Sequence, residues 1–113
     1  MPRKNLLLDA PPYEVEQAIK RLGKNLRTAR LRRNMTIEQA AEKIGTGPRA
    51  VMDAEKGKLA TGMAVYTALL WAYDLLRPFH ELADPQTDSE GLALDRLAGR
   101  ERARTGKGLD NDF

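Results

Sequence analysis

The sequence predicts an all-α protein with five helices and a flexible, charged C-terminal tail, and three observations lead to this prediction. Apolar residues recur at three- and four-residue steps, which is the period of a helix with one buried face. Proline, glycine and small polar residues stand where helices begin and end. No segment alternates apolar and polar residues with period two, so no β-strand is expected. The 113 residues suffice for one compact core.

The first predicted helix covers residues 13–33. Pro11 and Pro12 precede it, and proline suits the first turn of a helix, where its missing N–H is not needed. One apolar stripe runs along this helix, formed by Val15, Ala18, Ile19, Leu22, Leu26 and Ala29. Residues 1–12 are then an N-terminal arm.

Two short helices are predicted next, at 37–44 and 48–56, with a Gly-Thr-Gly turn between them. Thr36 is a good N-cap for the first of them, because its hydroxyl can accept a hydrogen bond from the first helical turn. Pro48 is suited to open the second, and Gly57 supplies the left-handed backbone that commonly follows a helix end.

Two further helices, at 62–75 and 78–82, complete a predicted domain of residues 13–85. Their aromatic side chains are expected in the core, namely Tyr66, Trp71, Tyr73 and Phe79. The remaining residues, 86–113, carry too little apolar surface to fold alone. They are interpreted as a mixed-charge tail with one or two helical turns around 93–99.

The segment from residue 22 to 83 resembles the lambda-repressor-like family of helix-turn-helix regulators. The likeness is carried by Leu22-Gly23-x-x-Leu26-Arg27-x-x-Arg30, by the turn from Ala41 to Gly45, and by Glu55-x-Gly57. The resemblance implies a five-helix DNA-binding domain in which 48–56 is the recognition helix. It also implies that Arg30 pairs with Glu55 as a structural ion pair.

Within such a domain, the outward face of helix 48–56 enters the major groove. Arg49 is suited to a bidentate contact with guanine, although it could equally be a solvated charge beside Asp53. Asp53 repels phosphate unless it accepts a hydrogen bond from a cytosine amino group. Candidate phosphate contacts are Thr36, Thr46, the amide of Gly47, and Lys56.

The net charge of +3 is unevenly distributed along the chain. Residues 1–60 hold 13 Lys and Arg against 7 Asp and Glu, whereas residues 61–113 hold 6 against 9. A basic first half favours a phosphate-facing surface, and a solvated helix face explains it equally well. The alternative function is a helix-turn-helix domain with weakened DNA specificity that acts mainly as a protein-interaction module. Residues that favour this alternative are Ile37, Pro48, Ala50 and Asp53.

The tail is similar to that of HipB-type antitoxins, which are helix-turn-helix partners of HipA-type kinase toxins. The similarity is carried by Asp84-Pro85, Gly91-Leu92, Arg96, the run Arg100-Glu101-Arg102-Ala103-Arg104 and the acidic end Asp110-Asn111-Asp112-Phe113. It implies partner-binding roles for Arg100, Arg102, Arg104 and Phe113. The alternative is a frayed terminus without a partner.

These observations predict a sequence-specific repressor that binds operator DNA as a homodimer. The more specific form of this prediction is the autoregulating antitoxin of a HipA-type kinase. No pairing of nucleophile and base and no phosphate-cradling loop is visible, so an enzyme is not expected. The chain has no cysteine and one histidine, His80, so neither a metal nor a cofactor is expected. The apolar run 6–8 is too short for a signal peptide or a membrane span, and a cytoplasmic protein is expected.

Overall fold

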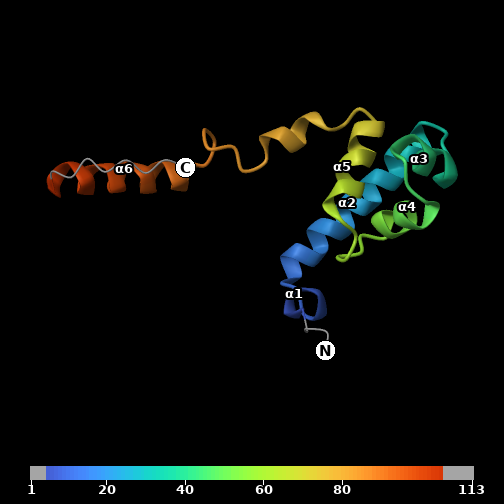
Figure 1. Ribbon diagram of the computed structural model, residues 1–113, viewed down its shortest axis with the longest axis horizontal. Helices are drawn as coiled ribbons and strands as arrows, with labels where there is room; N and C mark the ends of the chain where they lie inside the picture. The colour runs from blue at the N-terminus through green and yellow to red at the C-terminus, as the bar shows by residue number, and fades with distance from the viewer. Residues whose placement is uncertain (1–4, 106–113) are drawn as a thin grey trace. The chain divides into compact units, whose positions relative to one another are not determined.

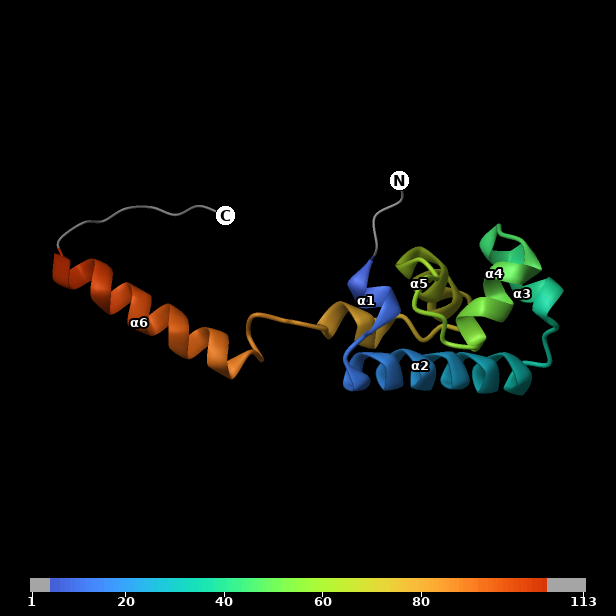
Figure 2. The same cartoon turned by 90° about the horizontal axis from the view of Figure 1, so that it is seen from below.

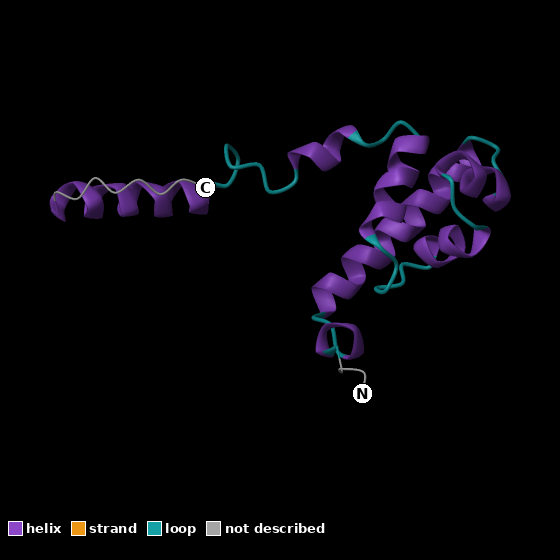
Figure 3. Cartoon of the chain, viewed as in Figure 1, coloured by secondary structure: helices purple, strands orange, loops and turns teal. Residues whose placement is uncertain are grey.

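The computed structural model describes residues 5–105, and the regular secondary structure of this part consists of helices joined by loops and turns (Figure 3). It contains six α-helices, one 3₁₀ helix and no strand, which confirms the all-α prediction for these residues. The elements are α1 (Leu6–Asp9), α2 (Tyr13–Arg32), α3 (Ile37–Ile44), α4 (Pro48–Glu55), α5 (Met63–Ala72), the 3₁₀ helix η1 (Arg77–Glu81) and α6 (Ser89–Thr105). No helix among them is both long enough and apolar enough to cross a membrane. The described chain forms two compact units, one ending at Phe79 and one beginning at His80.

The boundaries of α2, α3 and α4 follow from local backbone chemistry. Asn34 adopts a left-handed conformation, with φ of 58°, and ends the helical path of α2. Thr36 and Gln39 then form a reciprocal capping box, which satisfies two backbone N–H groups at the start of α3. Gly45 ends α3 with φ of 80°, and Pro48 opens α4. The predicted helix 37–44 is reproduced, and the helix predicted at 48–56 ends one residue earlier.

The backbones of α2 and α4 come into direct contact at two glycines. A Cβ on Gly23 would lie 2.5 Å from the carbonyl oxygen of Ala54 and 2.7 Å from that of Glu55. Gly57 has φ of 70°, and a Cβ there would lie 2.5 Å from the Cα of Lys20. Only glycine permits this close approach, so these two residues determine how tightly α4 packs on α2.

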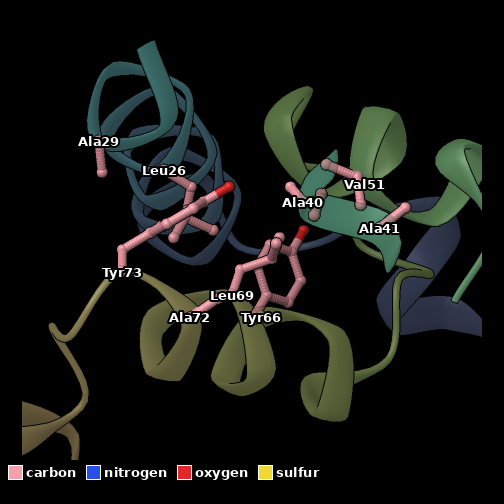
Figure 4. Packing of buried hydrophobic residues seen from close by; sticks show 10 residues of the cluster. Leu26, Ala29, Ala40, Ala41, Val51, Tyr66, Leu69, Ala72 and Tyr73 are labelled. Carbon is pink, nitrogen blue, oxygen red and sulfur yellow. The ribbon is translucent and has the colours of Figure 1, made fainter. Parts of the chain in front are cut away.

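The first unit is built around α2, with α3, α4 and α5 lying on one side of it (Figures 1 and 2). α3 packs against α4 and α5, and α4 also packs against α2. The side chains enclosed between these helices form the core, namely Leu26, Ala29, Ala40, Ala41, Val51, Ala54, Tyr66, Leu69, Ala72 and Tyr73 (Figure 4). A hydrogen bond also connects α3 with α5, because the Lys43 ammonium donates to the carbonyl of Ala72 at the end of α5 at 3.0 Å.

The aromatic residues of α5 and the segment after it divide between core and surface. Tyr66 and Tyr73 are buried, as predicted, and Phe79 is half-buried. The prediction that Trp71 belongs to the core is wrong, because 58% of its surface is exposed. α5 is apolar on all sides, so its sequence has no polar face to show which side the core covers.

The second unit contains α6, which is much longer than the one or two turns predicted around 93–99. It comprises 17 residues, and the Asp88 carboxylate caps its start by accepting a hydrogen bond from the Gly91 N–H at 2.9 Å. Ala, Leu, Arg and Glu then make up most of the helix, and these residues have high helix propensity. The helix predicted at 78–82 is instead the 3₁₀ helix η1.

The two buried tyrosines provide a matched pair for a stability test. The Tyr66 hydroxyl donates a hydrogen bond of 2.9 Å to the Lys58 carbonyl, whereas no described residue gives the Tyr73 hydroxyl a hydrogen bond. We predict that Tyr66→Phe lowers the free energy of unfolding by about 1 kcal/mol. Tyr73→Phe leaves it unchanged or raises it, because an unpaired buried hydroxyl is removed. Urea denaturation measures both values, and an equal loss in the two variants would contradict this account.

The burial of Tyr73 also predicts that the stability of the fold depends on pH. Burial raises the pKa of Tyr73 above its ordinary value, so the folded protein keeps this proton at a pH where the unfolded chain releases it. The stability of the wild type therefore falls as the pH rises through about 10, the ordinary pKa of tyrosine. Urea denaturation at alkaline pH should show a smaller fall for Tyr73→Phe.

Candidate nucleic-acid interface

A buried ion pair holds α4 on α2. The Arg30 Nε lies 2.7 Å from Glu55 Oε2, and Arg30 Nη2 lies 3.1 Å from Glu55 Oε1. Their side chains are only 8% and 6% exposed. The structure therefore brings together the two residues for which the resemblance implies a structural pair. Arg30 Nη1 also donates to the carbonyl of Met35 at 2.8 Å, so one guanidinium connects α2, the loop before α3 and the end of α4.

The pairing favours the charged form of Arg30. The hydrogen bonds that Arg30 donates to Glu55 raise the pKa of Arg30, against the smaller, opposing effect of its burial. Because both groups are charged and enclosed, removal of either one leaves the other buried without a counter-charge. The position of α4 relative to α2 therefore depends on both residues being present.

The turn between α3 and α4 leaves a helix N-terminus open. Gly47 is the N-cap of α4, and no side chain caps it. The first backbone N–H groups of a helix lack partners within the helix, and together with the helix dipole they favour an anion such as phosphate. Thr46 is half-buried, and its backbone N–H already donates to the Ala41 carbonyl at 2.9 Å. A contact from Thr46 to phosphate would therefore use its hydroxyl.

Thr36 lies at the other predicted phosphate contact, before α3. Its hydroxyl accepts a hydrogen bond from the Gln39 N–H at 3.0 Å, and its own N–H donates to Gln39 Oε1 at 2.9 Å. The capping box thus uses two of the polar groups of this exposed residue. The hydroxyl proton of Thr36 is the donor that this arrangement leaves for a phosphate oxygen.

The outer face of α4 carries positive side chains, while its inner face is buried. Val51 and Ala54 are fully enclosed. The side chain of Arg49 is 77% exposed, and Lys56, the C-cap residue two turns farther along, is also exposed. A hollow of about 260 Å³ lies beside this face, lined by Arg27, Arg30, Ile37, Met52, Glu55 and Lys56. The arrangement offers hydrogen-bond donors and positive charge to an anionic partner.

Asp53 is less available for contact with DNA than the sequence implies. Its side chain is 25% exposed, and its Oδ1 lies 3.2 Å from Lys58 Nζ and 3.7 Å from Arg49 Nε. Sequence reasoning placed Asp53 beside Arg49 but missed Lys58. Lys58 lies beyond the end of α4, and the left-handed backbone of Gly57 is what returns it toward the helix. One sequence feature could have indicated this contact. Gly57-Lys58 follows a helix that contains the acidic Asp53.

Three of the four predicted partner-binding residues lie in the part of the second unit that the structure describes. Arg100 and Arg102 lie on α6, and Arg102 Nε donates to the Ala98 carbonyl at 3.3 Å. Arg104 is on the last turn of α6, and Phe113 lies outside the described residues. His80 is exposed in η1, and residues 5–105 hold no group of three or more His, Cys, Asp or Glu arranged to bind a metal.

Comparisons of the chain with protein-family models, with curated proteins and with solved structures find no match. Function is therefore inferred from the residues and geometry of α2 to α5. The exposed face of α4, which the Arg30–Glu55 pair holds in place, is the surface best suited to bind an anionic partner.

We predict that Glu55→Gln lowers the free energy of unfolding by about 3 kcal/mol, because Arg30 then stays buried without a counter-charge. The control is Glu16→Gln, which removes the exposed pair between Glu16 and Lys20, 3.7 Å apart. Exposed pairs on one helix contribute only about 0.3–0.5 kcal/mol, so this variant should remain close to wild type. Thermal or urea unfolding distinguishes the two, and similar small losses would contradict the role of Arg30–Glu55.

Proposed function

We propose that this chain is a helix-turn-helix repressor that binds operator DNA with α4 in the major groove. The observation that carries the proposal is the outer face of α4, on which Arg49 is largely exposed while Val51 and Ala54 fix the helix to the core. A short, firmly held helix with an exposed polar face is what major-groove recognition requires. Arg49 reads a base, and the amide of Gly47 together with Thr36, Thr46 and Lys56 contacts phosphates.

The resemblance to lambda-repressor-like regulators supports this proposal at the level of the fold. Its implied elements include two short helices joined by a three-residue turn, and α3 and α4 have this arrangement. Its implied ion pair corresponds to Arg30 and Glu55, which lie within hydrogen-bond distance. We therefore assign the first unit to this fold as part of the proposal.

We further propose that the protein acts as a homodimer through the outer face of α5. Met63, Trp71 and Leu75 are exposed on or next to this helix, and α5 contains no charged residue. Two copies can bring identical apolar faces together without like-charge repulsion, and the self-complementary contact of a two-fold dimer is the commonest oligomeric arrangement. Dimerisation also lets one short reading helix per subunit act on two half-sites at once.

The tail supports the sharper form of the proposal, an autoregulating antitoxin of a HipA-type kinase. Leu94 and Leu97 are exposed on α6, and most helical stability in proteins comes from the packing of an apolar face rather than from propensity. Such a segment gains stability by ordering against a partner. Arg100, Arg102, Arg104 and Phe113 are the residues assigned to that contact.

The alternative function is an interaction module with weak DNA specificity. The exposed apolar residues of α5 and α6 favour it, since such side chains are typical of protein contacts. DNA binding distinguishes the two functions directly. Fluorescence anisotropy with the DNA upstream of the chain's own gene, against a scrambled duplex and over a salt series, should give at least about a 10³-fold preference. Equal, weak binding to both duplexes would favour the interaction module.

We predict that Arg49→Ala weakens binding to the specific duplex about tenfold or more and leaves binding to the scrambled duplex much less affected. The reason is that a bidentate contact to a base contributes about 1–3 kcal/mol of discrimination. Arg96→Ala is the control, because it removes the same charge from α6 in the second unit. An equal loss on both duplexes in Arg49→Ala would reduce its role to a phosphate contact.

We predict that Trp71→Asp converts the dimer to a monomer, because it places a charge on the apolar face. Sedimentation velocity measures this change, and binding to the specific duplex should weaken in parallel. Leu94→Asp introduces the same charge at an exposed leucine of α6 and should leave the dimer intact. A monomeric wild type, or a dimer that survives Trp71→Asp, would contradict the assigned face.

A further inference from the structure

Three charged side chains meet at the outer end of α4. Asp53 Oδ1 is closed off from solvent and lies between two cations, 3.2 Å from Lys58 Nζ and 3.7 Å from Arg49 Nε. The two pairs differ in burial, since the Arg49 side chain is 77% exposed and that of Lys58 is 48% exposed. Neither contact is a hydrogen bond, so the two cations compensate the negative charge of Asp53 by electrostatic attraction alone.

The core fixes the backbone of Lys58. Its N–H donates a hydrogen bond of 3.1 Å to the Asp53 carbonyl. Its own carbonyl accepts hydrogen bonds from the buried Tyr66 hydroxyl at 2.9 Å and from the Thr61 N–H at 3.1 Å. Because Tyr66 is anchored between the helices, the loop after Gly57 cannot move away from α4 without loss of these bonds. The backbone of Lys58 is thus held beside Asp53.

We propose that Asp53 is a positioning residue that orients Arg49 for the recognition of guanine. This inference rests on the proposed DNA-binding function. Asp53 Oδ1 lies 3.7 Å from Arg49 Nε, and the two terminal nitrogens, Nη1 and Nη2, have no hydrogen-bond partner among the described residues. Guanine presents two acceptors, N7 and O6, in the major groove, and paired terminal donors match them. The Nε pair strengthens when DNA excludes water, because the local dielectric constant falls.

The same geometry disfavours a direct contact between Asp53 and cytosine. One carboxylate oxygen is already enclosed by Lys58 and Arg49. Asp53 therefore acts through Arg49, and its charge is not presented to the phosphates as an isolated negative charge. The base preference of the site is assigned to guanine rather than to cytosine.

The test begins with the full-length wild-type protein and a pool of duplexes with a randomised centre. After selection, each guanine of the enriched duplex is replaced in turn by adenine, and affinities are measured by fluorescence anisotropy. At least one replacement should weaken wild-type binding about fivefold or more. Arg49→Lys keeps the charge but lacks the paired donors, so it should lose this preference and retain most of its affinity for a scrambled duplex.

The decisive variants are Asp53→Asn and Asp53→Glu. Asp53→Asn keeps the shape of the side chain but removes its charge, and it should reduce the guanine preference about threefold or more. Its affinity for a scrambled duplex should stay equal or rise, because one negative charge is gone. Asp53→Glu keeps a carboxylate four residues from Arg49 and should retain most of the preference. Thermal unfolding of each variant establishes that the fold is intact.

The outcomes separate this inference from the function on which it rests. A wild type that enriches no sequence overturns the proposed function and the inference with it. A wild type that prefers guanine while Asp53→Asn keeps the full preference overturns the inference alone, and Asp53 is then only a compensated charge. Equal loss of preference in Asp53→Asn and Asp53→Glu also overturns it, because the carboxylate would then have no orienting effect.

Discussion

The buried ion pair between Arg30 and Glu55 fixes the place of α4 on α2, and the rest of the first unit is arranged around this junction. Beside it, Gly23 brings the two backbones so close that no side chain fits between them. The glycine supplies the proximity, and the ion pair supplies the orientation, because a bidentate guanidinium–carboxylate contact allows little rotation. Neither effect alone would determine both the distance and the angle of α4.

A helix of eight residues such as α4 has little stability of its own, so its order depends on its contacts with the rest of the unit. Val51 and Ala54 anchor its inner side, and the Tyr66 hydroxyl anchors the loop that follows it. The outer side chains therefore start from a backbone that is already ordered. A partner that binds this face therefore loses little free energy in ordering the backbone, and the side chains that it must order are the exposed Arg49 and Lys56.

Much of the first unit is predictable from sequence because its signals are local. Thr36, Gly45 and Pro48 mark helix ends through chemistry that involves only neighbouring residues. The exposure of Trp71 was not predictable, since a helix that is apolar on all sides gives no indication of its covered face. Lys58 was missed because its approach to Asp53 depends on the left-handed turn at Gly57 and on Tyr66, two features of tertiary structure. The length of α6 was underestimated because helix propensity, rather than apolar periodicity, sustains it.

The exposure of Trp71 has a spectroscopic consequence. It is the single tryptophan of the chain, so intrinsic tryptophan fluorescence reports on the outer face of α5 and on no other site. Emission from a largely hydrated indole already lies toward long wavelength in the native protein, and unfolding shifts it little further. Burial of that indole against another surface shifts the emission to shorter wavelength. The emission wavelength of Trp71 therefore changes little when the core unfolds and changes clearly when another surface covers α5.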